Sequence, residues 1–262
     1  MVNSGRVVKG LKNRIFRVLV FLVPFCLVMF GFYVKLFHAD VFAVVVAEDG
    51  MFEQIQAGLY LLSSAAFILA AVRFFRLGEK PAASIFLVLS LGLALIFAEE
   101  ISWGQRIFNL ETSEYFSRNN TQGELTIHNL SMIQPFLHLS YILISLAGIG
   151  GWLLVKIAGR DSWKIYAPSW YLSSWFVPAF LIYIGLEVSF HMGAGGGGDL
   201  VSGPGRFFAW RDQELAELML SAGFFLFSIS ALRHASGWLK IPYGKQAGGF
   251  PVARQCRQTI QD

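Results

Sequence analysis

Residues 82–106 read AASIFLVLSLGLALIFAEEISWGQR, an apolar run of about seventeen residues that ends in two adjacent carboxylates. A helix of about twenty apolar residues spans a bilayer core of about 30 Å. A charged side chain at depth costs roughly 2.5–3.5 kcal/mol unless it is paired, protonated or in contact with water. Glu99 and Glu100 therefore predict both the boundary of a membrane-spanning helix and a candidate site.

The composition of the chain is that of an integral membrane protein. Of its 262 residues, 55% are hydrophobic and 15% are charged, compared with about 25% charged residues in soluble domains. The net charge is +4, but Lys and Arg lie at the ends of apolar runs, which excludes a nucleic-acid-binding face. Cys26 and Cys256 have no CxxC or nearby histidine spacing, so we expect neither a disulfide nor a thiolate metal site.

Six segments reach or approach the length needed to cross a bilayer, which predicts an all-α, polytopic bundle of six transmembrane helices. The first follows a basic start and is too long for the apolar part of a cleaved signal peptide, so we interpret it as a signal anchor. The expected spans are residues 15–36, 53–75, 82–101, 133–157, 170–191 and 213–234.

The distribution of Lys and Arg predicts the orientation of the bundle. With a cytoplasmic N-terminus, 16 of the 21 basic residues fall in inside segments, as the positive-inside rule requires. We expect a multi-pass protein of a bacterial inner membrane with both termini cytoplasmic. The expected organisation is a transmembrane domain over residues 1–240, an ordered outer loop over residues 102–132 and a disordered cytoplasmic tail over residues 241–262.

Acidic residues and histidines gather on the opposite side of the predicted bundle. Fourteen of the 17 acidic residues and four of the five histidines fall on the outer side or at outer helix ends. Topology does not demand this, because acidic residues contribute little to orientation. If the helix of residues 82–101 continues past its end, Glu99, Trp103 and Arg106 share one face. We predict Glu99, Glu100 and His128 as catalytic residues.

Two pairs of a glutamate and a histidine are spaced four residues apart. Glu124 precedes His128 in the outer loop, and Glu187 precedes His191 at the end of the fifth span. On a helix this spacing places both side chains on one face, as a metal-ligand pair requires. Oxygen and nitrogen ligands suit Zn²⁺ or Mn²⁺, which could activate water for hydrolysis. The predicted metal ligands are Glu53, Glu124, His128, Glu187, His191 and Glu217.

Two resemblances follow from these motifs. The runs EEISWGQR at residues 99–106 and NTQGELTIHN at residues 120–129, with EDGMFE at residues 48–53, resemble a group of uncharacterised bacterial multi-pass inner-membrane proteins. Glu99-Glu100 is also loosely similar to the EExxxR motif of the glutamate-type intramembrane proteases of the CAAX-processing family, with Gly104 in the place of the arginine. This second likeness implies a class analogy to intramembrane hydrolases.

These observations together predict a membrane-embedded, metal-dependent hydrolase or transferase that acts at the outer face on a lipid or lipid-linked substrate. The first alternative is a transporter or ion pathway with a carboxylate-lined site. The second is a non-catalytic subunit of a membrane assembly. The expected partners are the lipid bilayer and the lipid substrate, with no nucleic acid.

Overall fold

The computed structural model describes residues 4–47, 50–120, 123–191 and 210–239. Within these ranges every regular element is a helix, as the sequence predicts. Five helices are long and apolar enough to cross a membrane, or six if one bent pair forms a single span. The long helices are α1 (Ser4–Phe37), α3 (Met51–Arg76), α4 (Lys80–Glu100), α7 (Gln134–Ile157), α9 (Phe176–His191) and α10 (Gln213–Leu239).

Most of the expected spans lie within a few residues of these helices. The first differs more, because α1 starts well before residue 15 and is followed, after a break at His38, by the short α2 (Ala39–Val45). The tail predicted to be disordered lies outside the described residues, as do Glu48 and Asp49.

The expected span over residues 170–191 is not one continuous helix. The chain forms α8 (Trp170–Ser173) and then α9, and the segment that contains α8 meets α9 at an angle of 72°. Ser173 and Ser174 donate hydrogen bonds to the carbonyls of Trp170 (2.7 Å) and Tyr171 (3.0 Å), which competes with helix continuation. Pro178 has no N–H to bond the carbonyl four residues earlier, so it suits the first turn of a new helix.

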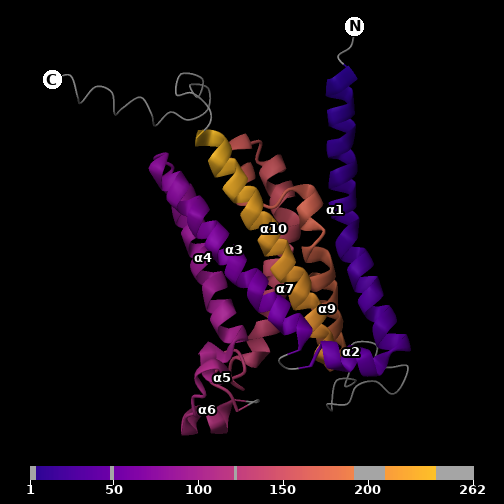
Figure 1. Ribbon diagram of the computed structural model, residues 1–262, viewed down its shortest axis with the longest axis vertical. Coiled ribbons are helices and arrows are strands. Elements are labelled where there is room, and N and C mark those ends of the chain that lie inside the picture. The colour runs from indigo at the N-terminus through magenta and orange to yellow at the C-terminus, as the bar shows by residue number, and fades with distance from the viewer. Residues whose placement is uncertain (1–3, 48–49, 121–122, 192–209, 240–262) are drawn as a thin grey trace, which may run out of the picture.

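The long helices, α1 aside, form an open arc (Figure 1). Along this arc α4 packs on α3, α3 on α10, α10 on α9 and α9 on α7, whereas α1 stands at the side of the bundle. In a bilayer, close packing and interhelical hydrogen bonds hold helices together. The contact between α3 and α4 uses small buried residues and a reciprocal pair in which the hydroxyls of Ser64 and Ser90 each donate to the other's carbonyl, at 2.9 and 2.8 Å.

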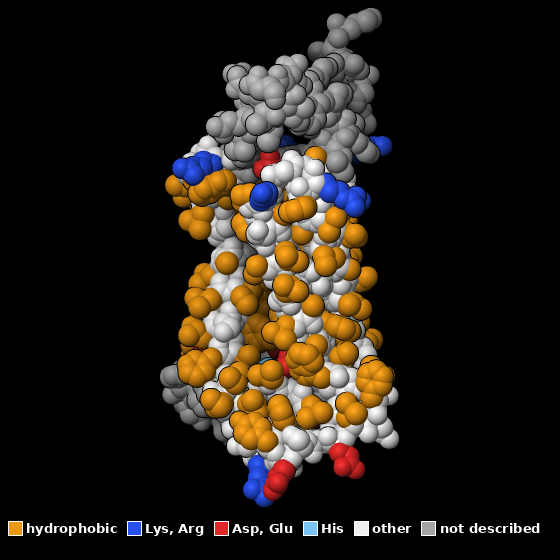
Figure 2. Space-filling view, turned by 90° about the vertical axis from the view of Figure 1, so that its left-hand side faces the viewer, with side chains coloured by type: hydrophobic (Ala, Val, Ile, Leu, Met, Phe, Trp, Pro, Cys, Tyr) orange, Lys and Arg blue, Asp and Glu red, His pale blue; other side chains and the backbone are white. Residues whose placement is uncertain are grey.

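The two ends of the bundle differ in charge. Lys and Arg form a rim at one end in Figure 2, and acidic side chains are visible at the other. The start of α1 and the end of α10 lie at the same end in Figure 1. We call the end with Arg73, Arg76, Lys80 and Lys156 the basic end, and the opposite end, where α4 finishes and α10 begins, the site end.

Candidate functional site

The site begins where α4 stops at its two carboxylates. Ser102, Trp103 and Gly104 have positive φ angles of 48°, 53° and 76°, and such a backbone costs about 1–3 kcal/mol for each non-glycine residue. The helix therefore does not continue, so the expected helical face shared by Glu99, Trp103 and Arg106 is not formed. The side chain of Arg106 lies outside the described residues. The reversal nevertheless returns the indole N–H of Trp103 to Oε1 of Glu99 at 2.6 Å.

The segment after this turn, with the short helices α5 (Gln105–Phe108) and α6 (Glu114–Asn119), folds back over the end of α4. The side chain of Gln105 links the two halves of this segment. Its Nε2 donates a hydrogen bond to Thr112 Oγ1 at 2.6 Å, and its Oε1 accepts one from the backbone N–H of Leu125 at 2.8 Å. Asn120 donates to the carbonyl of Thr126 at 2.8 Å. These bonds fix the stretch that carries His128.

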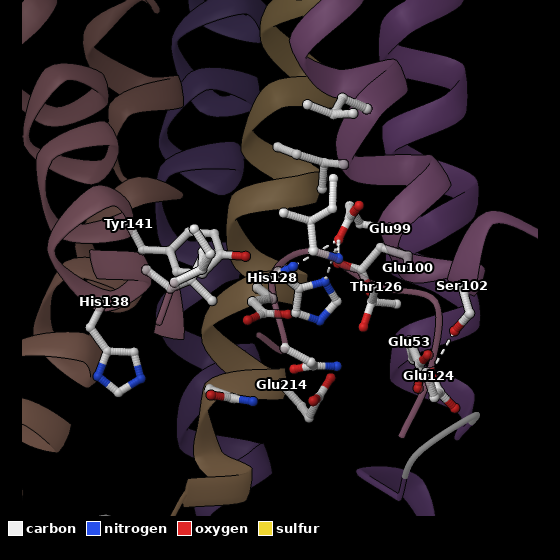
Figure 3. A pocket seen from close by; sticks show the side chains of 18 of the residues that line it. Glu53, Glu99, Glu100, Ser102, Glu124, Thr126, His128, His138, Tyr141 and Glu214 are labelled. Carbon is white, nitrogen blue, oxygen red and sulfur yellow. Dashed lines mark hydrogen bonds and ion pairs between the residues drawn. The ribbon is translucent and has the colours of Figure 1, made fainter. Parts of the chain in front are cut away.

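Glu99 and His128 form a carboxylate–imidazole pair, shown in Figure 3. Oε2 of Glu99 lies 3.1 Å from Nδ1 of His128 and accepts hydrogen bonds from the backbone N–H groups of Ile127 (2.7 Å) and His128 (2.9 Å). Only 11% of the Glu99 side chain is exposed, compared with 33% for His128. Glu99 therefore anchors both the loop and the ring, and the ring presents its other edge to the cavity.

The pair lies in the wall of a cavity of about 360 Å³. Its walls come from α4, the loop of residues 124–129, α7 and α10. The polar lining includes Glu53, Glu99, Glu100, Ser102, Glu124, Thr126, His128, Asn129, His138, Tyr141, Arg211, Gln213, Glu214 and Glu217, and the apolar lining includes Leu95, Ile96, Ile133 and Leu137. Carboxylates from α3, α4, the loop and α10 thus share one cavity, although they lie far apart in the sequence.

Two of these carboxylates are held by neighbouring side chains. Glu217 is buried and accepts a hydrogen bond from the hydroxyl of Tyr183 at 2.9 Å. Gln56 is also buried, and its amide donates to Oε2 of Glu214 at 3.2 Å and to the Glu214 carbonyl at 2.8 Å.

A second carboxylate–imidazole pair lies beside the cavity. Nδ1 of His138 on α7 is 2.6 Å from Oε1 of Glu187 on α9. His138 lines the cavity, whereas Glu187 does not. Glu187 therefore pairs with a histidine of another helix, and its expected i,i+4 partnership with His191 stays a prediction. The side chain of His191 lies outside the described residues.

The predicted metal ligands are only partly brought together. Glu53, Glu124, His128 and Glu217 line the cavity, and Glu187 lies outside it. Residues 123–128 are not helical, so Glu124 and His128 do not form the expected one-face pair, and Glu124 instead accepts a hydrogen bond from Ser102 Oγ at 2.5 Å. Among the described residues, no three Asp, Glu, His or Cys side chains have an arrangement that could hold a metal ion.

Several residues of the site escape sequence reasoning. Gln105 and Asn120 are positioning residues. The feature of the sequence that pointed to them was that they lie inside the two polar motifs. Tyr141 and Tyr183, whose rings stack at 4.8 Å between centroids, lie in apolar helix sequences and were not predicted as site residues. His138 stood out only as one of the histidines on the predicted outer side.

The sequence matches no known protein-family profile, and no match is found among curated proteins or among solved structures.

Proposed function

We propose that the protein is a membrane-embedded hydrolase or transferase that acts on a lipid or lipid-linked substrate, with His128 as general acid and base. The observation that carries this proposal is the Glu99–His128 pair in the cavity wall. With Nδ1–H donating to Glu99, the free lone pair of the imidazole lies on Nε2. In the described chain no protein group hydrogen-bonds Nε2, and this nitrogen is the one available to a substrate.

The reaction requires one proton to move twice. Nε2 of His128 takes the proton of a water molecule, or of an acceptor hydroxyl in a transferase, as that oxygen forms a bond to carbonyl carbon or phosphorus. The bond to the leaving oxygen then breaks, and Nε2 returns the proton to that oxygen. Glu99 keeps the ring in place and stabilises the imidazolium between the two transfers.

We infer that the site end faces away from the cytoplasm. The basic residues at the opposite ends of α3, α4 and α7 support this orientation through the positive-inside rule. Cysteines introduced at exposed positions Ser117 and Arg76 would test it in intact cells. A membrane-impermeant thiol reagent should label the first and not the second, and the reverse pattern would contradict the orientation.

A divalent metal, Zn²⁺ or Mn²⁺, stays a prediction from the sequence. Of the ligands predicted from the sequence, Glu53, Glu124, His128 and Glu217 line the cavity, and their oxygen and nitrogen atoms are of the kind that these ions bind. Elemental analysis of the purified protein, repeated on Glu99→Ala, tests the prediction. Stoichiometric metal in the wild type that falls in the variant would support it, and metal-free protein would remove the metal from the proposal.

The catalytic proposal is tested with purified protein in nanodiscs made from the lipid extract of its own membrane. Wild type, His128→Gln and the matched control His234→Gln, which changes an exposed histidine near the basic end, are followed by mass spectrometry of the lipids. We expect conversion by wild type and control and a loss of at least about 100-fold for His128→Gln. Equal conversion by His128→Gln, or no conversion by wild type, would contradict the proposal.

The second candidate is a transporter or ion pathway, and the buried hydrogen bond between Tyr183 and Glu217 favours it. A pathway through the bilayer needs ionisable or polar groups across its whole depth. The buried Lys, His, Asp and Glu residues of the described chain belong to the site end, namely Lys35, His138, Asp212 and Glu217. Deeper in the bundle the buried polar residues are serines, several of which bond the backbone of their own helix.

A further inference from the structure

Glu100 is the cavity carboxylate that has no partner among the described residues. Its side chain lines the cavity beside the Glu99–His128 pair, and the charges that act on it are those of Glu214, Glu53 and Glu99, all of the same sign. Throughout the described ranges, Glu100 accepts no hydrogen bond and forms no ion pair. Beyond what these ranges supply, a proton, a cation or a hydrogen-bond donor is therefore needed to stabilise this carboxylate.

The cost of such an arrangement points to a cationic ligand. Carboxylates taken out of bulk water are stabilised by a counter-ion and by hydrogen bonds, and like charges side by side oppose both. Glu214 and Glu217 line the same cavity as Glu100. Glu217 accepts a hydrogen bond from Tyr183, and Glu214 one from Gln56. Arg211 also lines the cavity, and its charge acts on Glu214. A carboxylate can accept several hydrogen bonds, so both retain room for a further donor.

The apolar part of the cavity wall shows where the rest of the ligand would lie. Leu95 and Ile96 come from α4, and Ile133 and Leu137 from the start of α7. These helices are the two ends of the open arc and, in the part of the chain that the structure describes, they do not pack extensively on each other. Figure 2 shows a hollow between two helical columns, lined by hydrophobic side chains, with acidic and histidine side chains at its lower end.

We propose that this cavity binds a membrane phospholipid whose head group ends in a primary ammonium, with an acyl chain lying in the groove between α4 and α7. A primary ammonium offers three N–H donors in a small volume, which suits Glu100, Glu214 and Glu217 together. A quaternary head group has no N–H donor and binds aromatic cages, whereas the described lining of this cavity has one tyrosine, Tyr141, and no tryptophan or phenylalanine. A head group with a net negative charge brings no cation to these carboxylates, and Arg211 in the described lining offers its charge to the phosphate of any phospholipid.

This inference rests on the proposed function in one respect, since it names the substrate class of the same site. It is tested by binding alone. The purified protein in detergent is titrated with phosphatidylethanolamine, phosphatidylcholine and phosphatidylglycerol that carry the same spin-labelled acyl chain, and the immobilised fraction is measured by electron paramagnetic resonance. We expect the ethanolamine lipid to bind at least about tenfold more tightly than the other two.

Two pairs of variants link this preference to the site. Glu100→Gln should remove most of the tenfold preference, and Glu79→Gln at the other end of α4 should retain it. Leu137→Trp should fill the groove and weaken binding of every lipid, whereas Leu139→Trp, on the exposed face of α7, should not. The Leu137 pair keeps the proposal testable if Glu100→Gln does not fold.

The outcomes separate binding from catalysis. Two results would overturn the lipid-ammonium site directly: equal affinity for the three lipids, or an unchanged preference in Glu100→Gln. Loss of binding on addition of a chelator would also overturn it, because a metal would then occupy the carboxylates. A clear preference without conversion in the nanodisc assay would retain the site and reject the proposed activity. Conversion that depends on His128 without any preference for the ethanolamine head group would do the opposite.

Discussion

Glu99 with His128 and Glu187 with His138 are two carboxylate–imidazole pairs that use the same ring nitrogen and bury opposite partners. In the first, the glutamate is 11% exposed and the histidine 33%. In the second, the histidine is 11% exposed and the glutamate 33%. The buried member fixes the geometry, so the first pair presents an imidazole to the cavity and the second leaves its carboxylate as the more exposed partner.

The surroundings of the pairs differ in the same sense. Glu99 also accepts hydrogen bonds from two backbone N–H groups and the Trp103 indole, and it sits below a loop closed by strained residues. The second pair joins two long helices, α7 and α9, which pack on each other. We infer that the first pair is built to hold one reactive group in place and that the second stabilises the packing of two helices.

The largest expected effect distinguishes the two histidines by activity. His128→Gln should lower the rate of lipid conversion by at least about 100-fold, because it removes the proton-transferring nitrogen, whereas His138→Gln should lower it by about tenfold or less. The rates are measured in the nanodisc assay at equal amounts of folded protein. A larger loss of rate in His138→Gln than in His128→Gln would indicate that the second pair, and not the first, carries the reactive histidine.

The second prediction concerns the support that Glu99 gives to His128. Glu99→Gln should lower conversion by about 100-fold, because its amide cannot accept all of the bonds from the ring, the backbone and the indole. Residues that act as one unit show non-additive effects. The double variant Glu99→Gln with His128→Gln should therefore be no slower than His128→Gln alone, and multiplication of the two losses would show that they act separately.

The third prediction tests the stabilising role of the second pair. His138→Phe or Glu187→Leu alone should lower the free energy of unfolding by about 1–3 kcal/mol, because each leaves a desolvated polar partner. The double variant should recover most of this loss, because both polar groups are removed. Thermal unfolding in detergent measures all three variants. Additive losses in the double variant would mean that the two side chains do not act as a pair.

The smallest expected effect comes from the turn that only the first pair depends on. Gly104 has a φ of +76°, and a Cβ there would lie 3.0 Å from the ring of Phe108. Gly104→Ala should cost about 1–2 kcal/mol. The matched control is Gly150→Ala in α7, where a Cβ meets nothing within 4 Å and the better helix former should be neutral or stabilising. Equal shifts in the thermal midpoint would contradict the strain at Gly104.

The sequence was sufficient for most of the fold, because spans of apolar residues depend on bilayer thickness and not on tertiary contacts. It placed Glu99 and Glu100 correctly in the last turn of α4. It did not predict the break within residues 170–191. The break comes from local hydrogen bonds of two serines and from a proline, whereas the apolar run continues through it.

The candidate site was less accessible to sequence reasoning. Spacing rules pair residues within one helix, so they suggested His191 for Glu187 and missed His138, which lies 49 positions away. They also paired Glu124 with His128, but that stretch is fixed by Gln105 and Asn120 in a non-helical loop. The charge distribution indicated the gathering of these side chains where spacing could not, because the carboxylates and histidines lie near the ends of several helices that meet at the site end.

The buried ion pair at the site end ties the first helix to the last. Nζ of Lys35 on α1 lies 2.5 Å from Oδ2 of Asp212, and these side chains are 2% and 1% exposed. Asp212 immediately precedes α10, which carries Glu214 and Glu217 into the cavity. The helix expected to be a signal anchor therefore supplies a counter-ion to the residue from which α10 starts. Detaching α1 would break this ion pair at the base of the helix that carries two of the cavity's carboxylates.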